Sequence, residues 1–216
     1  MPSGPIFFKN REVAAYRLLD ILPINKMKME DWTVLSTSYG GYPIAKIIAK
    51  ELDAQLDMIF SKKIYAPVNQ ECEIAIVTEA EEVLIHEELV KVFNISLDLI
   101  YGQAKFLYDN SLLYEVNRFR NQNKLTDLNE KNILLIDEGL NTGLTMMACI
   151  KSAIKLGAKS ISVAAPVIPS ASAQTIDSIA DDLYYVEKLD HFISIKFYYD
   201  TLDELKFKDI ETIKKD

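Results

Sequence analysis

Two adjacent carboxylates and a run of small and hydroxyl-bearing residues follow one apolar segment of this chain. The segment is Ile133–Ile136, and the carboxylates are Asp137 and Glu138. Glycines in the loop that comes next let the backbone approach a ligand, and amides at a helix start can point at a phosphate. Adjacent carboxylates can accept hydrogen bonds from sugar hydroxyls or hold magnesium through water. The candidate ligand-binding residues of this loop are Gly139, Leu140, Asn141, Thr142, Gly143, Leu144 and Thr145.

The same segment admits three other interpretations. The carboxylates could merely solvate a strand end while the glycines form an ordinary turn. Apolar residues before Asp-Glu also occur in the Walker B strand of nucleotide hydrolases, but the chain has no Gly-rich loop ending in Gly-Lys-Ser or Gly-Lys-Thr. A dinucleotide-binding fold would require Gly-x-Gly-x-x-Gly after a strand, and that spacing is absent as well. The last two interpretations therefore lose their main support.

Alternating strands and helices must position this loop. Ile133–Ile136 is apolar throughout and has polar flanks, which is typical of a central parallel strand buried on both faces. The pattern indicates a doubly wound, mostly parallel α/β sheet with helices on both faces, in which ligands bind beyond the carboxyl ends of the strands. Pro166 and Pro169 are expected to break the backbone. Further strands are expected at residues 32–36, 56–60, 73–77, 83–86, 161–165, 183–186 and 193–198, and helices at 43–52, 96–120, 146–156 and 172–180, with short tails at both ends.

Composition limits the classes of protein to consider. The 216 residues, 49% hydrophobic and 26% charged, suit a single domain over residues 1–216. A net charge of -8 disfavours broad nucleic-acid binding, and no apolar stretch approaches the length of a membrane span. Cys72 and Cys149 lack partners at metal-ligand spacing, so we expect neither zinc nor a disulfide framework. Without a recognisable leader, we expect a cytoplasmic protein.

Residues 133–145 resemble the signature of type I phosphoribosyltransferases, in which apolar strand residues lead to two acidic residues and a Thr-Gly-x-Thr phosphate loop. The chain is similar to a bacterial group of predicted phosphoribosyltransferases from about Phe8 to about Leu205. The resemblance implies the type I fold with a small hood region, which we expect at about residues 64–125. Residues 164–167, Ala-Ala-Pro-Val, match the strand end after the phosphate loop.

Two further segments support the resemblance. The turn 38–43 matches the Pro-Arg-Gly-Gly turn of the group, where backbone amides hold pyrophosphate, so Gly40 and Gly41 become candidate ligands. Tyr39 stands at the position of the usual arginine. Lys63 matches a lysine that meets the pyrophosphate, and Glu73 adds a negative charge near it.

A pair near the end of the helix before the central strand, Glu115 and Arg118, matches the group as well. Arg118 is interpreted as either structural or able to reach phosphate.

The resemblance implies transfer of a phosphoribosyl group between phosphoribosyl pyrophosphate and a nitrogenous base, with magnesium. In this hypothesis Asp137, Glu138 and Lys63 are the catalytic residues, and the two carboxylates meet magnesium through water. The competing hypothesis is a non-catalytic sensor of nucleotides or sugar phosphates, because Tyr39 offers one neutral hydroxyl where arginine offers a forked cation. The sequence leaves the acceptor base, the pathway and the oligomeric state open, with a homodimer among the alternatives.

Other polar and aromatic residues are interpreted as structural. His86 and His191 have no visible catalytic partner. The aromatic residues at 184–185 and 197–199 are expected to pack in the core. The acidic residues Glu79, Glu81 and Glu82 are expected on a solvated loop that belongs to the hood.

Overall fold

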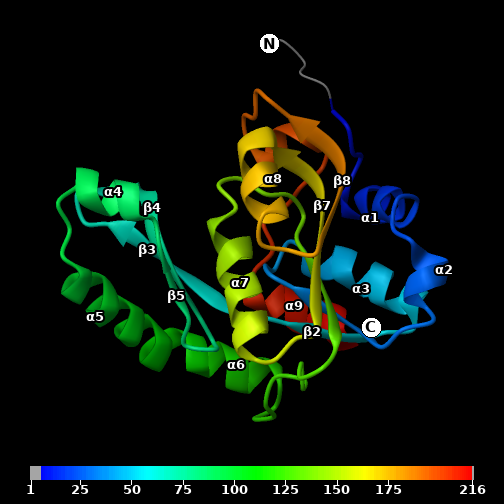
Figure 1. Cartoon of the computed structure of the whole chain (residues 1–216), viewed down its shortest axis with the longest axis horizontal. Helices are drawn as coiled ribbons and strands as arrows, with labels where there is room; N and C mark the ends of the chain where they lie inside the picture. The colour runs from blue at the N-terminus through cyan, green and yellow to red at the C-terminus, as the bar shows by residue number, and fades with distance from the viewer. Residues whose placement is uncertain (1–5, 216) are drawn as a thin grey trace.

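A five-stranded parallel sheet forms the centre of the molecule (Figure 1). A computed structural model describes residues 6–215. All four strand pairings of this sheet are parallel, which confirms the predicted mostly parallel α/β fold. In spatial order the strands are β2 (Gln55–Met58), β1 (Trp32–Ser36), β6 (Asn132–Ile136), β7 (Ser160–Pro169) and β8 (Asp182–Leu189).

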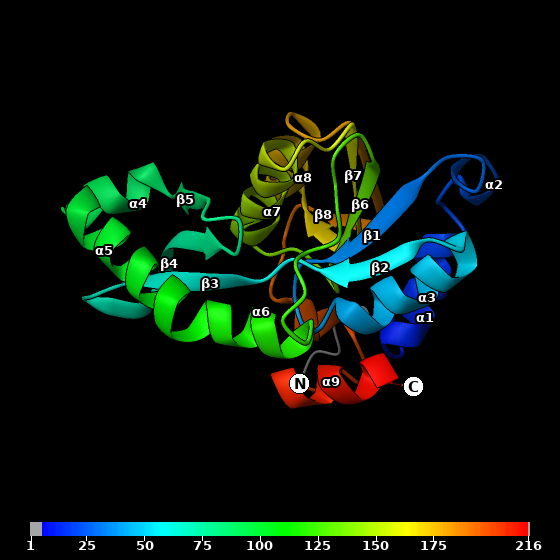
Figure 2. The same cartoon turned by 90° about the horizontal axis from the view of Figure 1, so that it is seen from below.

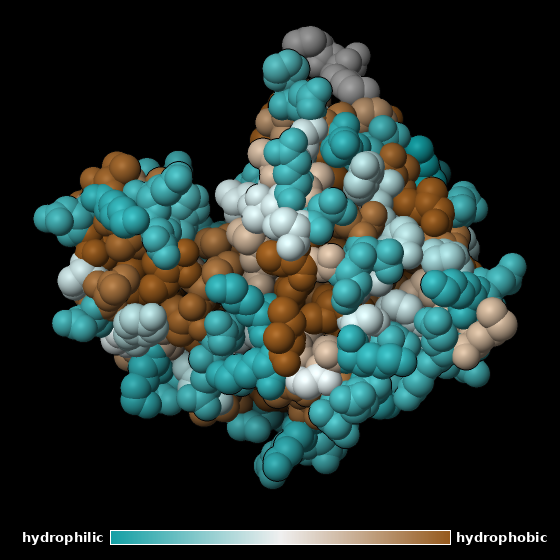
Figure 3. Space-filling model, in the orientation of Figure 1, coloured by the Kyte–Doolittle hydropathy of each residue, from teal (hydrophilic) through white to brown (hydrophobic). Residues whose placement is uncertain are grey.

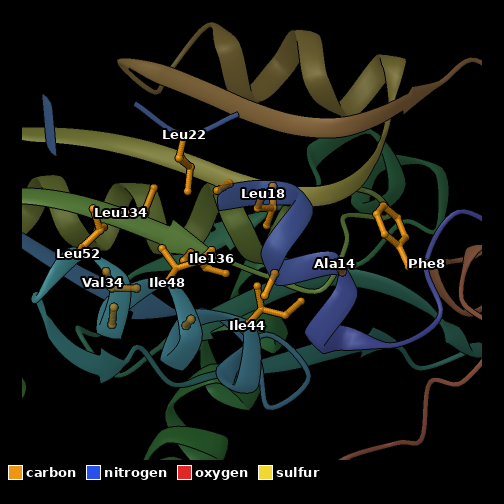
Figure 4. Close-up of a cluster of buried hydrophobic side chains, with 14 of the residues drawn as sticks. Phe8, Ala14, Leu18, Leu22, Val34, Ile44, Ile48, Leu52, Leu134 and Ile136 are labelled. Atoms are coloured by element: carbon orange, nitrogen blue, oxygen red, sulfur yellow. The ribbon is translucent and has the colours of Figure 1, made fainter. Parts of the chain in front are cut away.

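Helices cover both faces of this sheet because its central strands are apolar on both sides. Successive side chains of a strand point to opposite faces, so Leu134 and Ile136 face one core and Ile133 and Leu135 the other. The first core packs against α1 (Arg11–Leu19) and α3 (Tyr42–Leu52), as Figure 4 shows. The second packs against α7 (Leu144–Lys155) and α8 (Ser170–Asp177).

A second, antiparallel sheet stands to one side of the core (Figure 2). It consists of β3 (Ser61–Ala66), β4 (Asn69–Thr78) and β5 (Val83–Ile85), and it is followed by α4 (Glu87–Val92) and α5 (Leu97–Leu107). We call residues 61–119 the hood. Its apolar core is separate from the two cores of the main sheet. The space-filling view shows a lobe at the left, where Figure 1 places α4, β3 and α5, with a notch between it and the taller part of the molecule (Figure 3).

The long helix expected at residues 96–120 runs from α5 through a π-helical turn (Tyr108–Leu112) into α6 (Leu113–Phe119). Ser96 caps the start of α5, because its side chain accepts a hydrogen bond from the amide of Leu99. Gly102 lies inside α5 without interrupting it. The regular α-helical geometry is interrupted at the π-helical turn, which contains Asn110.

Arg120 fixes the hood to the main sheet at the end of α6. Its guanidinium donates to both oxygens of Asp57 on β2, at 3.0 and 3.1 Å, and it also pairs with Glu79, which follows β4. Glu79 in turn accepts from the amide of Phe60 at 2.8 Å. The expectation that Glu79 lies on a solvated loop was therefore wrong, because its side chain is only 8% exposed and neutralises a buried cation.

Two other expectations were wrong for reasons of hydrogen bonding. Pro166 lies inside β7. On one side, β6 ends opposite Ala164, and on the other, β8 pairs with Ala165 and Val167 but not with Pro166. The strand therefore needs no amide hydrogen at Pro166. The strand expected at residues 193–198 contains a 3-10 helix (Ile195–Tyr198) instead. The Tyr198 hydroxyl accepts from the amide of Ile193 and donates to the carbonyl of His191, which folds this segment back on itself.

The tails also differ from expectation. The N-terminal region forms α1 and a short helix, α2 (Ile24–Met27), and the C-terminal region forms α9 (Phe207–Lys215). Apolar residues of α9 pack with those of α3 and α6 in a cluster at the base of the hood. Within residues 6–215, no helix has the length and apolar character needed to cross a membrane.

Candidate active site

A cleft of about 330 Å³ lies between the carboxyl ends of β1 and β6 and the hood. The structure brings together in its lining Tyr39, Lys63, Asp137, Glu138 and the whole loop 139–145. Gly40 and Gly41 do not line it. The remaining lining residues are Thr37, Ser38, Met58, Phe60, Ser61, Lys62, Glu73, Met146 and Ile195.

The loop 139–145 ends in a helix start whose amides are available to a ligand. Gly143 caps α7 with φ +77°, a left-handed conformation that a side chain disfavours. Among residues 6–215, the amides of Gly143, Thr145 and Met146 have no hydrogen-bond acceptor, whereas that of Leu144 donates to Thr142 Oγ1 at 3.3 Å. Ser172 braces the loop by donating to the carbonyl of Asn141 at 2.6 Å. Free amides at a helix N-terminus bind phosphate groups well.

Asp137 is buried directly after β6 and is held by three donors. The hydroxyl of Thr37 donates to its Oδ2 at 2.9 Å, and the hydroxyl of Ser38 and the amide of Glu138 donate to its Oδ1. Burial raises the pKa of Asp137, and these donors oppose that rise. The carboxylate is thus fixed in orientation, with an acceptor site left on Oδ2.

Glu138 contacts an arginine that the sequence analysis missed. Arg11 on α1 approaches Oε2 of Glu138 to 2.6 Å and also donates to the carbonyls of Gly40, at 3.0 Å, and Asp203, at 2.7 Å. Burial and the adjacent charge of Asp137 raise the pKa of Glu138 to about 7, against the opposing effect of Arg11. Arg11 is separated from Glu138 by 127 positions, and no local motif marks it.

The turn 38–43 packs directly against the acidic pair. A side chain on Gly41 would lie 2.8 Å from Cα of Asp137, so only glycine permits this close approach. The amide of Gly41 already donates to Ser38 Oγ at 3.0 Å. The carboxylate of Glu138 occupies the space beside Gly40. This geometry gives both glycines a structural role beside the acidic pair, and their contact with a ligand stays a prediction.

The hood side of the cleft carries two lysines, each paired with a glutamate. Lys63 Nζ lies 2.7 Å from Glu73 Oε2, and Lys62 Nζ lies 2.6 Å from Glu115 Oε1. The Tyr39 hydroxyl donates to Glu115 Oε2 at 2.7 Å. Burial lowers the pKa of Lys63, but the hydrogen bond and charge of Glu73 outweigh it, and the net pKa is raised. Lys63 therefore stays cationic.

Arg118 and the two histidines do not line the cleft. Arg118 pairs with Glu211 of α9 at 2.7 Å, on an exposed part of α6. His86 caps α4 by accepting from the amide of Leu89 at 3.4 Å. The backbone carbonyl of His191 accepts from Tyr198.

The raised pKa of Glu138 predicts a pH-dependent effect of Glu138→Gln on stability. A carboxyl group whose folded pKa lies above its unfolded value stabilises the fold below the unfolded pKa, near 4.3, and that contribution is lost as pH rises through the folded pKa. We expect the stability of the variant relative to the native chain to increase by on the order of 3 kcal/mol from about pH 4.5 to pH 7.5. Urea unfolding across that range measures it.

Glu51→Gln is the matched control for that measurement. Lys28 lowers the pKa of Glu51, so the effect of this variant should change little over the tested range. A difference in unfolding free energy between Glu138→Gln and the native chain that stays constant with pH would contradict this prediction. It would show that the charge of Arg11 outweighs burial and that the pKa of Glu138 is not raised.

The fold is that of the type I phosphoribosyltransferase class. Its central parallel strand leads through an acidic pair to free amides at the start of a helix, and an antiparallel hood lies beside the sheet. The chain belongs to the phosphoribosyl transferase domain family, whose profile matches residues 5–200. The family inferred from the motifs of the sequence is thereby confirmed.

Individual relatives are distant. Two Mycobacterium tuberculosis proteins, "Putative phosphoribosyl transferase MT0597" and "Putative phosphoribosyl transferase Rv0571c", are each 26% identical over 153 residues. The match covers 69% of this chain and 34% of each relative, so the chain spans about a third of the length of the curated relatives it matches. The crystal structure of TT1426 from Thermus thermophilus aligns with a TM-score of 0.76 at 21% identity, covering 95% of this chain and 96% of that chain, and supports the fold alone.

Proposed function

We propose that this chain transfers the 5-phosphoribosyl group between phosphoribosyl pyrophosphate and a nitrogenous base. The observation that carries the proposal is the loop 139–145, whose free amides at the start of α7 line the same cleft as Asp137 and Lys63. Membership of the phosphoribosyl transferase domain family supports it.

Each part of the cleft has a role in this reaction. The amides of Gly143, Thr145 and Met146 bind the 5-phosphate. Asp137 accepts hydrogen bonds from the ribose hydroxyls and stabilises the positive charge that develops on the ribose as the bond at C1 breaks. Lys63, as a cation on the hood side, binds the departing diphosphate.

Magnesium fits this cleft as an ion carried by the diphosphate. Among residues 6–215, no group of three or more His, Cys, Asp or Glu side chains is arranged to hold a metal. Asp137 and Glu138 already have partners in Ser38, Thr37 and Arg11, so the ion would meet them through its water shell. When bound, magnesium would neutralise charge on the leaving diphosphate.

A second candidate is a non-catalytic sensor that binds a nucleotide or sugar phosphate in the same cleft. Tyr39 favours it, because its hydroxyl donates to Glu115 and supplies no cation to a diphosphate. A sensor would keep the phosphate loop and lose discrimination for the diphosphate.

Calorimetric titration separates the two candidates. The ligands are phosphoribosyl pyrophosphate, ribose 5-phosphate and nucleoside monophosphates, each with and without magnesium. Transfer requires that phosphoribosyl pyrophosphate bind more tightly with magnesium and that a supplied base release pyrophosphate. Equal affinity for all three ligands, without an effect of magnesium, would favour the sensor.

The phosphate loop itself is tested by Gly143→Ala. The left-handed φ of Gly143 penalises a side chain by about 1–2 kcal/mol, which the loop relieves by moving its amides. Because a new Cβ would meet Ser172 only at 3.5 Å, no clash accompanies the strain. We expect ribose 5-phosphate affinity to fall about tenfold in the same titration.

Gly102→Ala is the matched control, because its added Cβ on α5 meets nothing within 4 Å. This variant should bind ribose 5-phosphate as the native chain does and gain about 0.5–1 kcal/mol of stability. Unchanged affinity in Gly143→Ala would place the phosphate elsewhere.

A further inference from the structure

The charges of the hood side of the cleft differ from those of its phosphate loop. The loop offers backbone amides to an anion, and within residues 6–215 no carboxylate accepts a hydrogen bond from those amides. On the hood side, the cations are two lysine side chains, and each already has a carboxylate within 2.7 Å. An anion arriving there meets neutral pairs of side chains.

The pair of Lys63 and Glu73 is built into the hood sheet. Lys63 lies on β3 and Glu73 on the neighbouring antiparallel strand β4, where Glu73 pairs in register with Tyr65. Glu73 is 14% exposed and Lys63 49% exposed, and both line the cleft. The carboxylate is therefore the more fixed partner, and an anion that binds Lys63 must compete with it.

The pair of Lys62 and Glu115 repeats this arrangement at the base of the hood. Glu115 on α6 binds Lys62 with one oxygen and the hydroxyl of Tyr39 with the other. Both partners are partly buried, at 24% and 19% exposure. Tyr39, the residue at the turn, thus orients a carboxylate toward a cleft lysine.

We propose that Glu73 and Glu115 are specificity-determining residues, which compete with the diphosphate of the ligand for Lys63 and Lys62 and selectively weaken its binding. This inference rests on the proposed function, because it assumes that the sugar phosphate lies in the loop 139–145. A ligand with an uncharged substituent at C1, such as a nucleoside monophosphate, leaves both pairs intact. A ligand with a diphosphate must break at least one of them, and it faces the repulsion of the freed carboxylate.

Glu73→Gln tests the inference as a gain of affinity. The variant keeps the shape of the side chain and frees the charge of Lys63. We expect about tenfold tighter binding of magnesium phosphoribosyl pyrophosphate and of magnesium pyrophosphate, measured by calorimetry. Affinity for ribose 5-phosphate should stay within about twofold of the native value. A purely structural role of Glu73 would not raise affinity for one ligand class alone.

Glu115→Gln is the second variant, with the same expected direction, and it serves if Glu73→Gln does not fold. Glu87→Gln is the control for net charge, because Glu87 pairs with Lys91 on exposed α4 and does not line the cleft. It should change none of the affinities.

Unchanged or weaker diphosphate binding in both cleft variants, with ribose 5-phosphate still bound, would overturn this inference and leave the proposed function standing. A gain shared by ribose 5-phosphate would overturn its selectivity. If the native chain bound none of these ligands, the proposed function would fail and this inference with it.

Discussion

Replacement of Asp137 by asparagine is expected to reduce phosphoribosyl transfer by about two to three orders of magnitude and to leave the fold intact. Thr37, Ser38 and the amide of Glu138 fix the carboxylate at the end of β6, where it lines the cleft. Asparagine has the same shape without the negative charge that, in the proposed reaction, stabilises a cationic ribose. Transfer assays, together with titration of phosphoribosyl pyrophosphate, measure the effect.

Stability provides the internal check on that variant. Burial raises the pKa of Asp137, so its charge does not stabilise the fold. Loss of this charge should therefore change the free energy of unfolding by at most about 1 kcal/mol. Asp109→Asn is the matched control, because Asp109 is on the π-helical turn of the hood and pairs with Lys105 away from the cleft. Transfer and affinity that survive in Asp137→Asn would show that the acidic pair has been assigned the wrong role.

The site could be predicted from sequence where its parts are contiguous. Ile133–Ile136 is apolar on both faces, and the residues after it enter a helix directly, so strand, acidic pair and loop lie in one continuous segment. The register of β6 between β1 and β7 then places this segment at the centre of the sheet. Local pattern and tertiary structure agree here.

Other parts depend on tertiary contacts that no local pattern encodes. Arg11 reaches Glu138 because α1 packs against α3, the helix that follows the turn at Gly40. Glu79 seemed solvated within an acidic run, yet the fold places it beside Arg120, 41 positions away. Residues 193–198 alternate like a strand, but the hydroxyl of Tyr198 holds the backbone of this segment folded on itself, and β8, which pairs with β7, stays the edge strand of the sheet. In each case a long-range or side-chain contact, and not the local sequence pattern, determines the structure.

The largest effect on stability is expected from Arg120→Met. Arg120 is buried between Asp57 and Glu79, and it also donates to the carbonyl of Met58. Methionine removes the cation and leaves two buried carboxylates without a counter-charge, which costs about 3–5 kcal/mol. Burial already raises the pKa of Glu79, and Arg120 opposes that rise. Urea unfolding should show the loss as a lower midpoint.

Arg118→Met provides a control on the same helix, because the ion pair of Arg118 with Glu211 lies on an exposed part of α6 and should contribute little to the free energy of unfolding. Adding Asp57→Asn and Glu79→Gln to Arg120→Met should recover part of the loss, since no buried charge then remains unpaired. Equal effects of Arg118→Met and Arg120→Met would show that burial of the ion pair is unimportant.

The buried pairs of Arg120 also connect stability to the cleft. Glu79 holds the amide of Phe60, and Arg120 holds the carbonyl of Met58, so together they fix the segment that leads into β3. Lys62 and Lys63 follow directly on that strand. At low temperature, where Arg120→Met is still folded, the lysines should lose their fixed position while the loop 139–145 keeps its own. Affinity for ribose 5-phosphate should then persist, while phosphoribosyl pyrophosphate should lose the additional affinity that its diphosphate contributes. The reason is that the two ends of the cleft are held by different parts of the fold.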